Sequence, residues 1–220
     1  MSAGSDQQQH WEATYGTHEE FFGVGPSDFG VRAATALAEA KVETLLELGC
    51  GQGRDTLLFL QRGFHVTALD YAETAIRQLQ TRADGAGYGS QLTTYTHDAR
   101  EPLPFPKEKF DACFSHMFFT MALTERELER AFAEVWRVLE PGGLNLYSVR
   151  NDHDPHFGKG VHVAEDMWQN PMGFVVHFFS ADKVRRLASG YDLLWMREFE
   201  DPSPPFTKKL YDVALRKAST

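Results

Sequence analysis

Three glycines at alternate positions follow a short apolar segment that ends at residue 48. Gly49, Gly51 and Gly53 stand in the run ELGCGQG. Glycines at this spacing let the backbone turn sharply and approach a ligand closely. A helix that begins directly after them would aim its free N–H groups and the positive end of its dipole at that ligand. The run therefore predicts a loop that binds a cofactor.

The spacing of this loop argues against two common cofactor classes. A dinucleotide-binding loop has the pattern G-x-G-x-x-G, and Arg54 stands where the third glycine of that pattern belongs. The loop also lacks the lysine that holds the phosphates of a nucleoside triphosphate. We therefore expect neither NAD nor a nucleoside triphosphate, although a nicotinamide-dependent oxidoreductase would share the same class of fold.

Polar residues stand at the ends of the predicted strands that follow. Asp70 ends the β-rich run 65–70, Asp98 follows the run 91–96, and Ser115 ends the run 110–115 with His116 directly after it. Ligands of open α/β sheets bind outside the carboxyl ends of the strands, which makes these side chains site candidates. His116 is the best-placed catalytic base. The alternative is an imidazole that packs or hydrogen-bonds the cofactor.

Two aromatic residues, Trp11 and Tyr15, lie one helical turn apart near the N-terminus. Aromatic faces stabilise a desolvated cation, so this pair could close over a positively charged ligand. The alternative is plain core packing, which is common for an aromatic stripe at helical spacing.

Residues 151–180 contain four of the nine histidines, together with several acidic residues. The run HDPH at residues 153–156 matches no standard spacing of metal ligands, and Asp154-Pro155 favours a turn. A connection of this length in a compact domain is usually functional. We therefore predict a polar lid that gates the substrate, without a metal site.

The remaining chain reads as alternating strands and helices. Residues 1–9 are small and polar and are expected to fray, and a short helix is expected over 11–22. Ser27, Thr124 and Ser180 are predicted to cap helices. Strands are predicted at 42–48, 65–70, 91–96, 110–115 and 144–149, with further helices at 56–62 and 72–83 and two final strands at 193–199 and 210–215. This order predicts an α/β fold with a doubly wound, mostly parallel sheet and an antiparallel closing hairpin.

Length and composition limit the class of protein. The chain has 220 residues, 42% of them hydrophobic. This fits one domain over 1–220, with an N-terminal cap helix at about 10–23 and the lid inserted at about 151–180. The formal net charge of −9 disfavours nucleic acid and anionic membranes as partners. The N-terminus lacks a basic, apolar leader and the two cysteines build no disulfide scaffold, so we expect a cytoplasmic protein; its oligomeric state is left open.

Four signposts in order give the chain a specific resemblance. It resembles the class I S-adenosylmethionine-dependent methyltransferases over residues 11–150, and more loosely over the closing hairpin. The signposts are ELGCGQG at 47–53, Asp70, His97-Asp98-Ala99 and LEPGG at 139–143. The run GRDT at 53–56 is similar to the small-molecule branch, of thiopurine and tellurite type. The resemblance implies a Rossmann-like sheet of seven strands.

The resemblance also implies roles for individual residues. Asp70 would accept both ribose hydroxyls of S-adenosylmethionine, and Asp98 would accept the adenine amino group beside the N–H of Ala99. Glu47 would order the N–H groups of the loop or bind the cofactor's ammonium group. The full set of expected cofactor-binding residues is Trp11, Tyr15, Glu47, Gly49, Gly51, Gly53, Asp70, Tyr71, Asp98, Ala99 and Ser115.

The function implied is transfer of a methyl group from S-adenosylmethionine to a small-molecule acceptor by in-line displacement, with S-adenosylhomocysteine as the product. The enzyme would contribute mainly by aligning the nucleophile, the methyl group and the sulfur and by excluding water. A thiol-like acceptor would need no base. Two alternatives stay open: a non-catalytic, regulatory S-adenosylmethionine-binding protein on the same fold, and an RNA methyltransferase, which would need a basic face.

Overall fold

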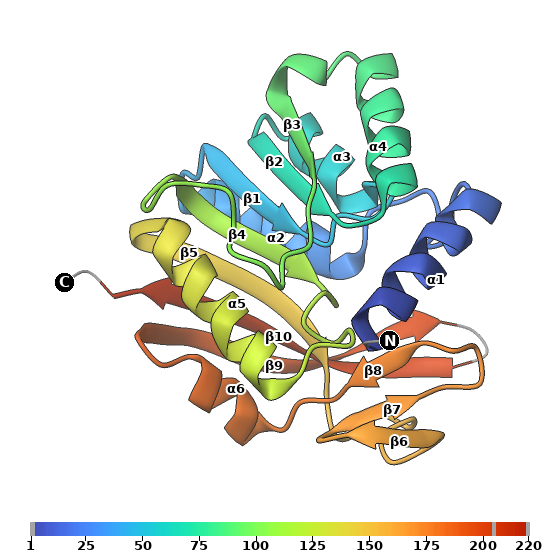
Figure 1. Ribbon diagram of the computed structural model, residues 1–220. Coiled ribbons are helices and arrows are strands. Elements are labelled where there is room, and N and C mark those ends of the chain that lie inside the picture. The colour runs from blue at the N-terminus through green and yellow to red at the C-terminus, as the bar shows by residue number, and fades with distance from the viewer. Residues whose placement is uncertain (1–2, 204–205, 219–220) are drawn as a thin grey trace.

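A computed structural model describes residues 3–203 and 206–218. Seven strands form one twisted sheet with helices on both faces, and a small second sheet lies beside one end of it (Figure 1). The helices are α1 (Ala3–Thr17), α2 (Asp28–Glu39), α3 (Arg54–Gln61), α4 (Glu73–Gly85), α5 (Glu125–Val138) and α6 (Ala181–Leu187), with a short 3-10 helix η1 (Gly89–Gln91).

The strands of the large sheet are β1 (Thr44–Leu48), β2 (His65–Asp70), β3 (Leu92–Thr96), β4 (Phe110–His116), β5 (Leu139–Arg150), β9 (Tyr191–Ser203) and β10 (Phe206–Lys217). Their order is β3-β2-β1-β4-β5-β10-β9. The first five pair in parallel, and β10 runs antiparallel to both β5 and β9. The predicted fold is confirmed, and the carboxyl ends of β1, β2 and β4 meet at one edge.

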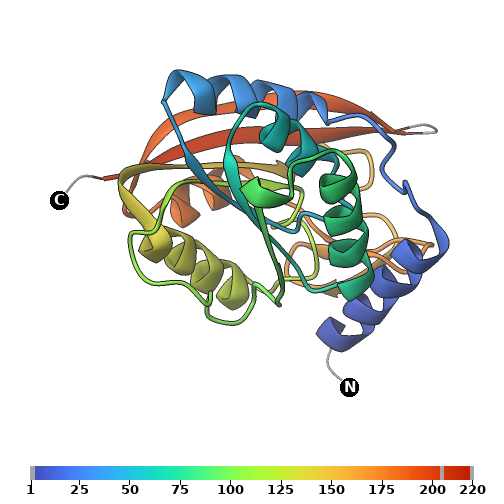
Figure 2. The ribbon, with the colours of Figure 1, turned by 90° about the horizontal axis from the view of Figure 1, so that it is seen from above.

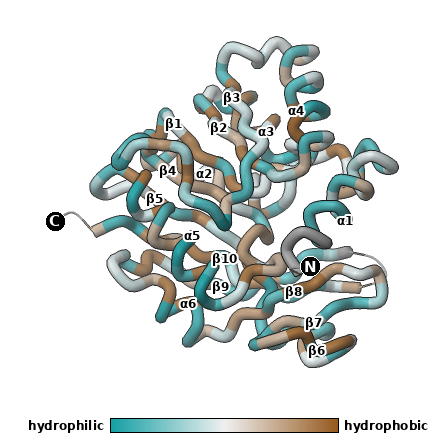
Figure 3. Tube along the Cα trace, viewed as in Figure 1, coloured by the Kyte–Doolittle hydropathy of each residue, from teal (hydrophilic) through white to brown (hydrophobic). Residues whose placement is uncertain are grey.

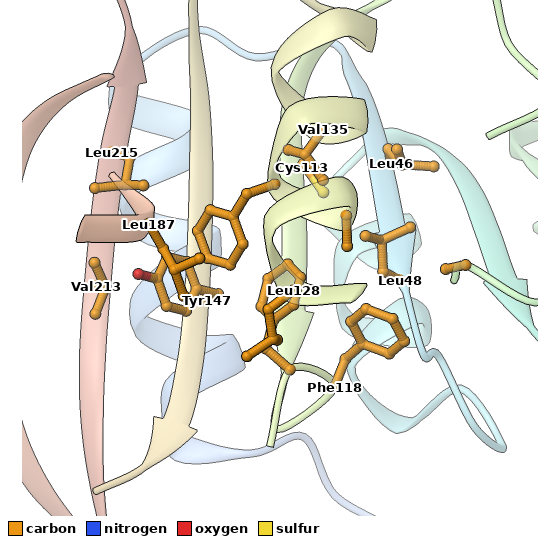
Figure 4. Close-up of a cluster of buried hydrophobic side chains, with 14 of the residues drawn as sticks. Leu46, Leu48, Cys113, Phe118, Leu128, Val135, Tyr147, Leu187, Val213 and Leu215 are labelled. Carbon is orange, nitrogen blue, oxygen red and sulfur yellow. The ribbon is translucent and has the colours of Figure 1, made fainter. Parts of the chain in front are cut away.

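Alternate side chains of the strands enter two separate cores. Leu45 packs with helices α2, α3 and α4 on one face, whereas its neighbour Leu46 packs with α5 and α6 on the other. Viewed from above, α2 and α5 lie on opposite sides of the sheet (Figure 2). In the second core, Leu128 and Val135 of α5 belong to the same buried cluster as Tyr147 of β5 (Figure 4). Hydrophobic residues accordingly concentrate along the central strands (Figure 3).

The predicted helix caps are present. The Ser27 hydroxyl accepts from the N–H of Gly30, and the Ser180 hydroxyl accepts from that of Lys183. Thr124 and Glu127 form a reciprocal capping box at the start of α5. These bonds satisfy N–H groups that a helix leaves free at its first turn, and thereby set where α2, α5 and α6 begin.

The expected start and the expected end of the N-terminal helix were both wrong. Helix α1 begins at Ala3, where a frayed segment was expected, and it ends at Thr17 instead of continuing to residue 22. The Gln7 amide donates to the carbonyl of Gly173 and the Gln8 amide donates to the carbonyl of Tyr71. Contacts with distant segments thus order a stretch whose local composition predicts disorder.

Residues 151–180 have secondary structure of their own, which the sequence did not indicate. Strands β6 (Val161–Ala164), β7 (Met167–Gln169) and β8 (Val175–His177) form an antiparallel sheet. The rings of Phe157, Trp168 and Phe178 pack together beside it, with centroids 4.8 to 5.9 Å apart. We call this segment the insertion. No helix among the described residues is long and apolar enough to cross a membrane.

Gly53 offers a test of how tightly the glycine loop is packed. Its φ is +82°, and a Cβ atom placed there would lie 2.2 Å from Cδ1 of Leu79 in α4. We expect Gly53→Ala to lower the free energy of unfolding by about 2 to 4 kcal/mol, because it combines backbone strain with overpacking. Urea denaturation measures the change. Gly85→Ala, in open space at the end of α4, is the control; equal stabilities of the two variants would contradict this packing.

Candidate functional site

A cavity opens where the carboxyl ends of β1, β2 and β4 meet, under helix α1. Its walls come from α1, the glycine loop after β1, and the segments that follow β2, β3 and β4. The expected site residues that line it are Trp11, Tyr15, Glu47, Gly49, Gly51, Gly53, Asp70, Tyr71, Ala99 and His116. The sequence therefore located most of the walls of this cavity.

The glycine loop has the backbone shape that its composition predicts. Gly49, Gly51 and Gly53 have φ values of +68°, +51° and +82°, in the left-handed region. The N–H groups of Gly49 and Cys50 donate to the carbonyl of Leu69, which ties the loop to the end of β2. A Cβ atom on Gly51 would lie 3.0 Å from the hydroxyl of Tyr15. Gly51 thus packs closely against Tyr15 of α1, where a side chain would be crowded.

Asp70 joins the loop to the next helix. Its two carboxylate oxygens accept from the N–H of Gly51 and from that of Ala72, each at 2.9 Å. Burial raises the pKa of Asp70 to about 6, although both of these hydrogen bonds act in the opposite direction. A carboxylate oxygen can accept more than one hydrogen bond, so Asp70 can receive further donors from a ligand.

Glu47 makes its hydrogen bond below the loop. The hydroxyl of Thr56 in α3 donates to its carboxyl group at 2.7 Å. Burial raises the pKa of Glu47 well above its ordinary value, and Asp55 and Asp70 raise it further. None of the described hydrogen bonds links the Glu47 side chain to the N–H groups of the loop, so its expected role there stays a prediction.

Trp11 and Tyr15 belong to the wall of the cavity that α1 provides, which we call the roof. Their rings stack with centroids 5.3 Å apart, and both side chains are buried while lining the cavity. Core packing and contact with a ligand, which were alternatives for these two residues, are therefore compatible. Helix α1 is held on α4 by Glu12, which accepts from both the N–H and the hydroxyl of Thr74.

Gln52 and Arg54 have roles that sequence reasoning missed. The Gln52 amide donates to the carbonyl of His18 at 2.6 Å and accepts from the N–H of Phe21 at 3.0 Å. The Arg54 guanidinium donates to the carbonyl of Phe22 at 2.7 Å. Both residues thus fasten the segment 18–22, which follows α1, to the glycine loop. The signal in the sequence for these two roles was the presence of polar residues between and directly after the glycines.

His116 is partly buried and belongs to the cavity wall. Its Nδ1 lies 2.6 Å from the hydroxyl of Ser148 on β5, and its Nε2 is buried without a partner among the described residues. Burial lowers the pKa of His116 well below its ordinary value, and the charges of Arg54, Lys208 and Arg32 lower it further. An imidazole with such a low pKa is a weak base.

Asp98 and Ser115 are not brought to the cavity. Arg100 donates to the Asp98 carboxylate through its backbone N–H and its guanidinium. Partial burial acts to raise the pKa of Asp98, but Arg100 outweighs it and holds the pKa below its usual value. The Ser115 side chain is fully buried within the sheet, because neighbouring strand residues point to opposite faces. His97 and Ala99, on either side of Asp98, line the cavity instead.

The insertion supports the roof without lining the cavity. None of its described residues lies in the cavity wall. The Phe174 ring packs against Trp11 and His10 of α1, with centroids 4.6 and 4.3 Å apart. The Gln7 side chain also accepts from the N–H of Val175. The insertion thus contacts α1 beside the cavity, and its role as a lid stays a prediction.

One cluster in and beside the insertion has the composition of a metal site. Single ligand atoms of Glu125, Glu165 and His177 lie within 4.8 Å of one another. The ammonium group of Lys183 lies 2.6 Å from both His177 Nε2 and a Glu125 oxygen, and 2.8 Å from Asp166. A fixed ammonium cation thus stands among these groups and neutralises the carboxylates.

Comparison with known proteins agrees with this geometry. Residues 45–143 match a family profile described as a methyltransferase domain. The biotin biosynthesis bifunctional protein BioHC of Teredinibacter turnerae is 37% identical over 108 residues, which cover 46% of this chain and 18% of that protein. The human tRNA N(3)-cytidine methyltransferase METTL2B is 26% identical over 171 residues, covering 73% and 44%. The chain thus spans less than half the length of these relatives.

A solved structure gives the same fold. The crystal structure of a SAM-dependent methyltransferase from Methanosarcina mazei superposes with a TM-score of 0.69 at 22% sequence identity. The match covers 81% of this chain and 93% of that one. It extends the likeness from the central profile match to most of the elements described above.

The packing of Phe174 on α1 predicts that the insertion controls the roof. We expect Phe174→Ala to speed hydrogen exchange of the backbone amides in α1 by about tenfold, because it removes a ring that packs on Trp11. Mass spectrometry after exchange measures this rate. Met172→Ala, at a side chain that is 65% exposed two residues away, is the matched control. Unchanged exchange in the Phe174→Ala variant would show that α1 holds its place without the insertion.

Proposed function

We propose that this chain, whose residues 45–143 match a methyltransferase domain, transfers a methyl group from S-adenosylmethionine to a small-molecule acceptor. One observation carries the proposal. A single cavity runs from the left-handed glycine loop and the buried carboxylate of Asp70 to His116 at the end of β4. The glycine loop and Asp70 offer the donors and acceptors that a nucleoside cofactor needs, and we place the acceptor beside His116 in the same cavity.

The residues at the loop fit this cofactor. Asp70 is buried and keeps acceptor capacity on both oxygens, which suits the two ribose hydroxyls. Tyr71 and Ala99 stand beside it in the cavity wall, on the side proposed for the adenine ring. Trp11 and Tyr15 present aromatic rings from the roof, where they would stabilise a positive charge beneath them. Asp98 does not line the cavity and accepts from Arg100, so its expected contact with the adenine stays a prediction.

The protein's contribution to the reaction is alignment and exclusion of water. S-adenosylmethionine supplies an electrophilic methyl group on a positively charged sulfur, and that charge disappears as the methyl group leaves. Donors aimed at a developing negative charge would therefore add little. The roof formed by α1 and residues 18–22 keeps water out and holds the acceptor in line with the methyl group.

A small molecule suits the cavity better than an RNA does. Gln52 and Arg54 fasten the segment over the cavity mouth, and the net charge of −9 opposes a polyanion. Methylation of tRNA is the second candidate, and the match to a human tRNA methyltransferase over 73% of this chain favours it. A non-catalytic binding protein would keep the cofactor part of the cavity alone.

One assay distinguishes the three candidate functions. The protein is incubated with methyl-labelled S-adenosylmethionine and either a protein-free small-metabolite extract or total tRNA. We expect label in the small-metabolite fraction and none in tRNA. Label in tRNA alone would replace the proposed acceptor class. Binding of S-adenosylhomocysteine without transfer to either fraction would indicate a binding protein.

Asp70 gives the sharpest test of cofactor binding. We expect Asp70→Ala to weaken binding of S-adenosylhomocysteine by about 2 to 4 kcal/mol, because two charge-assisted hydrogen bonds to the ribose are lost. Isothermal titration calorimetry measures the affinity. The control is Asp182→Ala on α6, where the side chain is 94% exposed. Equal affinity of both variants for the ligand would remove Asp70 from the binding site.

The same residue predicts how binding depends on pH. The ionised carboxylate accepts the ribose hydroxyls, so binding lowers the pKa of Asp70 from its value of about 6 in the free protein. Affinity should be constant above pH 7 and should fall by up to about tenfold per pH unit below pH 6. Calorimetry between pH 5 and 8 tests this, and Asp70→Asn, which cannot ionise, should bind weakly with a flat profile. A flat profile for the wild type would contradict the assignment.

A further inference from the structure

Residues 117–123, between β4 and α5, provide the cavity wall at the end of β4. Met117, Phe118 and Met121 of this segment line the cavity. Phe118 also packs against the glycine loop, because a Cβ atom placed on Gly49 would lie 3.0 Å from its ring. The segment forms neither helix nor strand, so bonds to other parts of the chain have to hold it in place.

His177, the last residue of β8, bonds this segment at two residues. Its backbone N–H donates to the carbonyl of Thr120 at 2.8 Å, and the Thr120 hydroxyl donates to the carbonyl of His177 at 2.6 Å. The ring Nδ1 of His177 lies 2.6 Å from the carbonyl oxygen of Leu123. All three residues are buried, so the loss of one of these bonds would leave a polar group without a partner.

The two neighbours of the His177 ring define where its proton lies. A carbonyl oxygen can only accept, so Nδ1 carries the proton that is donated to Leu123. The ammonium group of Lys183 lies 2.6 Å from Nε2 and can only donate. Nε2 therefore carries no proton, and the hydrogen bonds assign His177 as a neutral imidazole in the Nδ1–H tautomer.

Lys183 lies where it can fix this tautomer. Its ammonium group is held 2.6 Å from a carboxylate oxygen of Glu125 and 2.8 Å from one of Asp166. The same Glu125 oxygen lies 3.6 Å from Nε2 of His177. Without the lysine, the single proton of a neutral ring would move to Nε2 and pair with Glu125, since burial disfavours a doubly protonated ring. Nδ1 would then have no proton to donate to Leu123.

We propose that Lys183 and His177 are positioning residues for methyl transfer: Lys183 fixes the Nδ1–H tautomer of His177, and this tautomer holds residues 117–121 in the cavity wall. The inference rests on the proposed function, in which the acceptor lies beside that wall. Neither Lys183 nor His177 lines the cavity, so neither touches the reacting atoms. Their contribution is to the alignment of the groups that react.

A role in stability alone explains this arrangement less well. Lys183 could pair with Glu125 and Asp166 without an imidazole beside it, and ion pairs with partly exposed partners contribute little to stability. The imidazole, in contrast, connects the ammonium group to the backbone of the cavity wall. The contacts thus link α6 and the insertion to the segment that shapes the cavity.

The test uses the full-length protein saturated with S-adenosylhomocysteine and labelled with ¹⁵N-histidine. The NMR signals of His177 are assigned by their loss in His177→Asn. At neutral pH we expect the Nδ1–H tautomer in the wild type and the Nε2–H tautomer in Lys183→Met. In that variant the backbone amides of residues 117–123 should exchange about tenfold faster, because the bond to Leu123 is lost. Lys183→Arg, which restores a cationic donor, should restore both properties.

Activity separates positioning from stability. With methyl-labelled S-adenosylmethionine and the small-metabolite extract, transfer by Lys183→Met should fall at least about tenfold. Its affinity for S-adenosylhomocysteine should equal that of the wild type. Lys159→Met, at an exposed site in the insertion, is the matched control and should change neither quantity.

The outcomes distinguish this inference from the proposed function. An Nε2–H tautomer in the wild type, or wild-type exchange and transfer in Lys183→Met, would overturn the inference. If Lys183→Met does not fold, Lys183→Gln takes its place; as a neutral donor it should keep the Nδ1–H tautomer and slow exchange, and loss of either would overturn the inference as well. If the wild type transfers no label, the proposed function fails, and the tautomer and exchange still decide whether Lys183 holds the wall.

Discussion

The buried carboxylate of Asp70 is the interaction on which the site depends. It holds the glycine loop through Gly51 and the start of α4 through Ala72, so one group fixes both walls of the cofactor region. Burial raises the pKa of this carboxyl group to about 6, and the hydrogen bonds that it accepts from described residues come from the backbone N–H groups of Gly51 and Ala72. A ligand that brings two hydroxyl donors completes what the fold leaves unfinished.

The region around Asp70 also connects α1, which forms the roof, to the start of α4 and the glycine loop. Ala72 gives α4 no side-chain cap, and Glu12 of α1 accepts from the free N–H of Thr74 instead. Helix α1 therefore docks at the point where Asp70 also bonds, next to the glycine loop. The insertion then packs on the far side of α1 through Phe174. The glycine loop, α1 and the insertion are thus linked by consecutive contacts at this edge of the sheet.

The sequence predicted what short-range chemistry determines. The apolar runs bounded by glycine and proline became strands, and the loop at Gly49 to Gly53 adopted the left-handed backbone that only glycine accepts readily. It did not predict what distant contacts determine. The order of residues 3–9 comes from Gln7 and Gln8, which bond segments far away in the chain. Arg100 also pairs with Asp98, which the pattern of residue types did not indicate, and the expected adenine contact of Asp98 stays a prediction.

Arg54 shows how the glycine loop and the roof are connected. Its guanidinium donates to the carbonyl of Phe22 at 2.7 Å, and its backbone begins α3 directly after Gly53. Gln52 makes a similar connection from within the loop, because its amide bonds both His18 and Phe21. The loop that approaches the cavity therefore also holds residues 18–22, and packed segments of this kind move together rather than one by one.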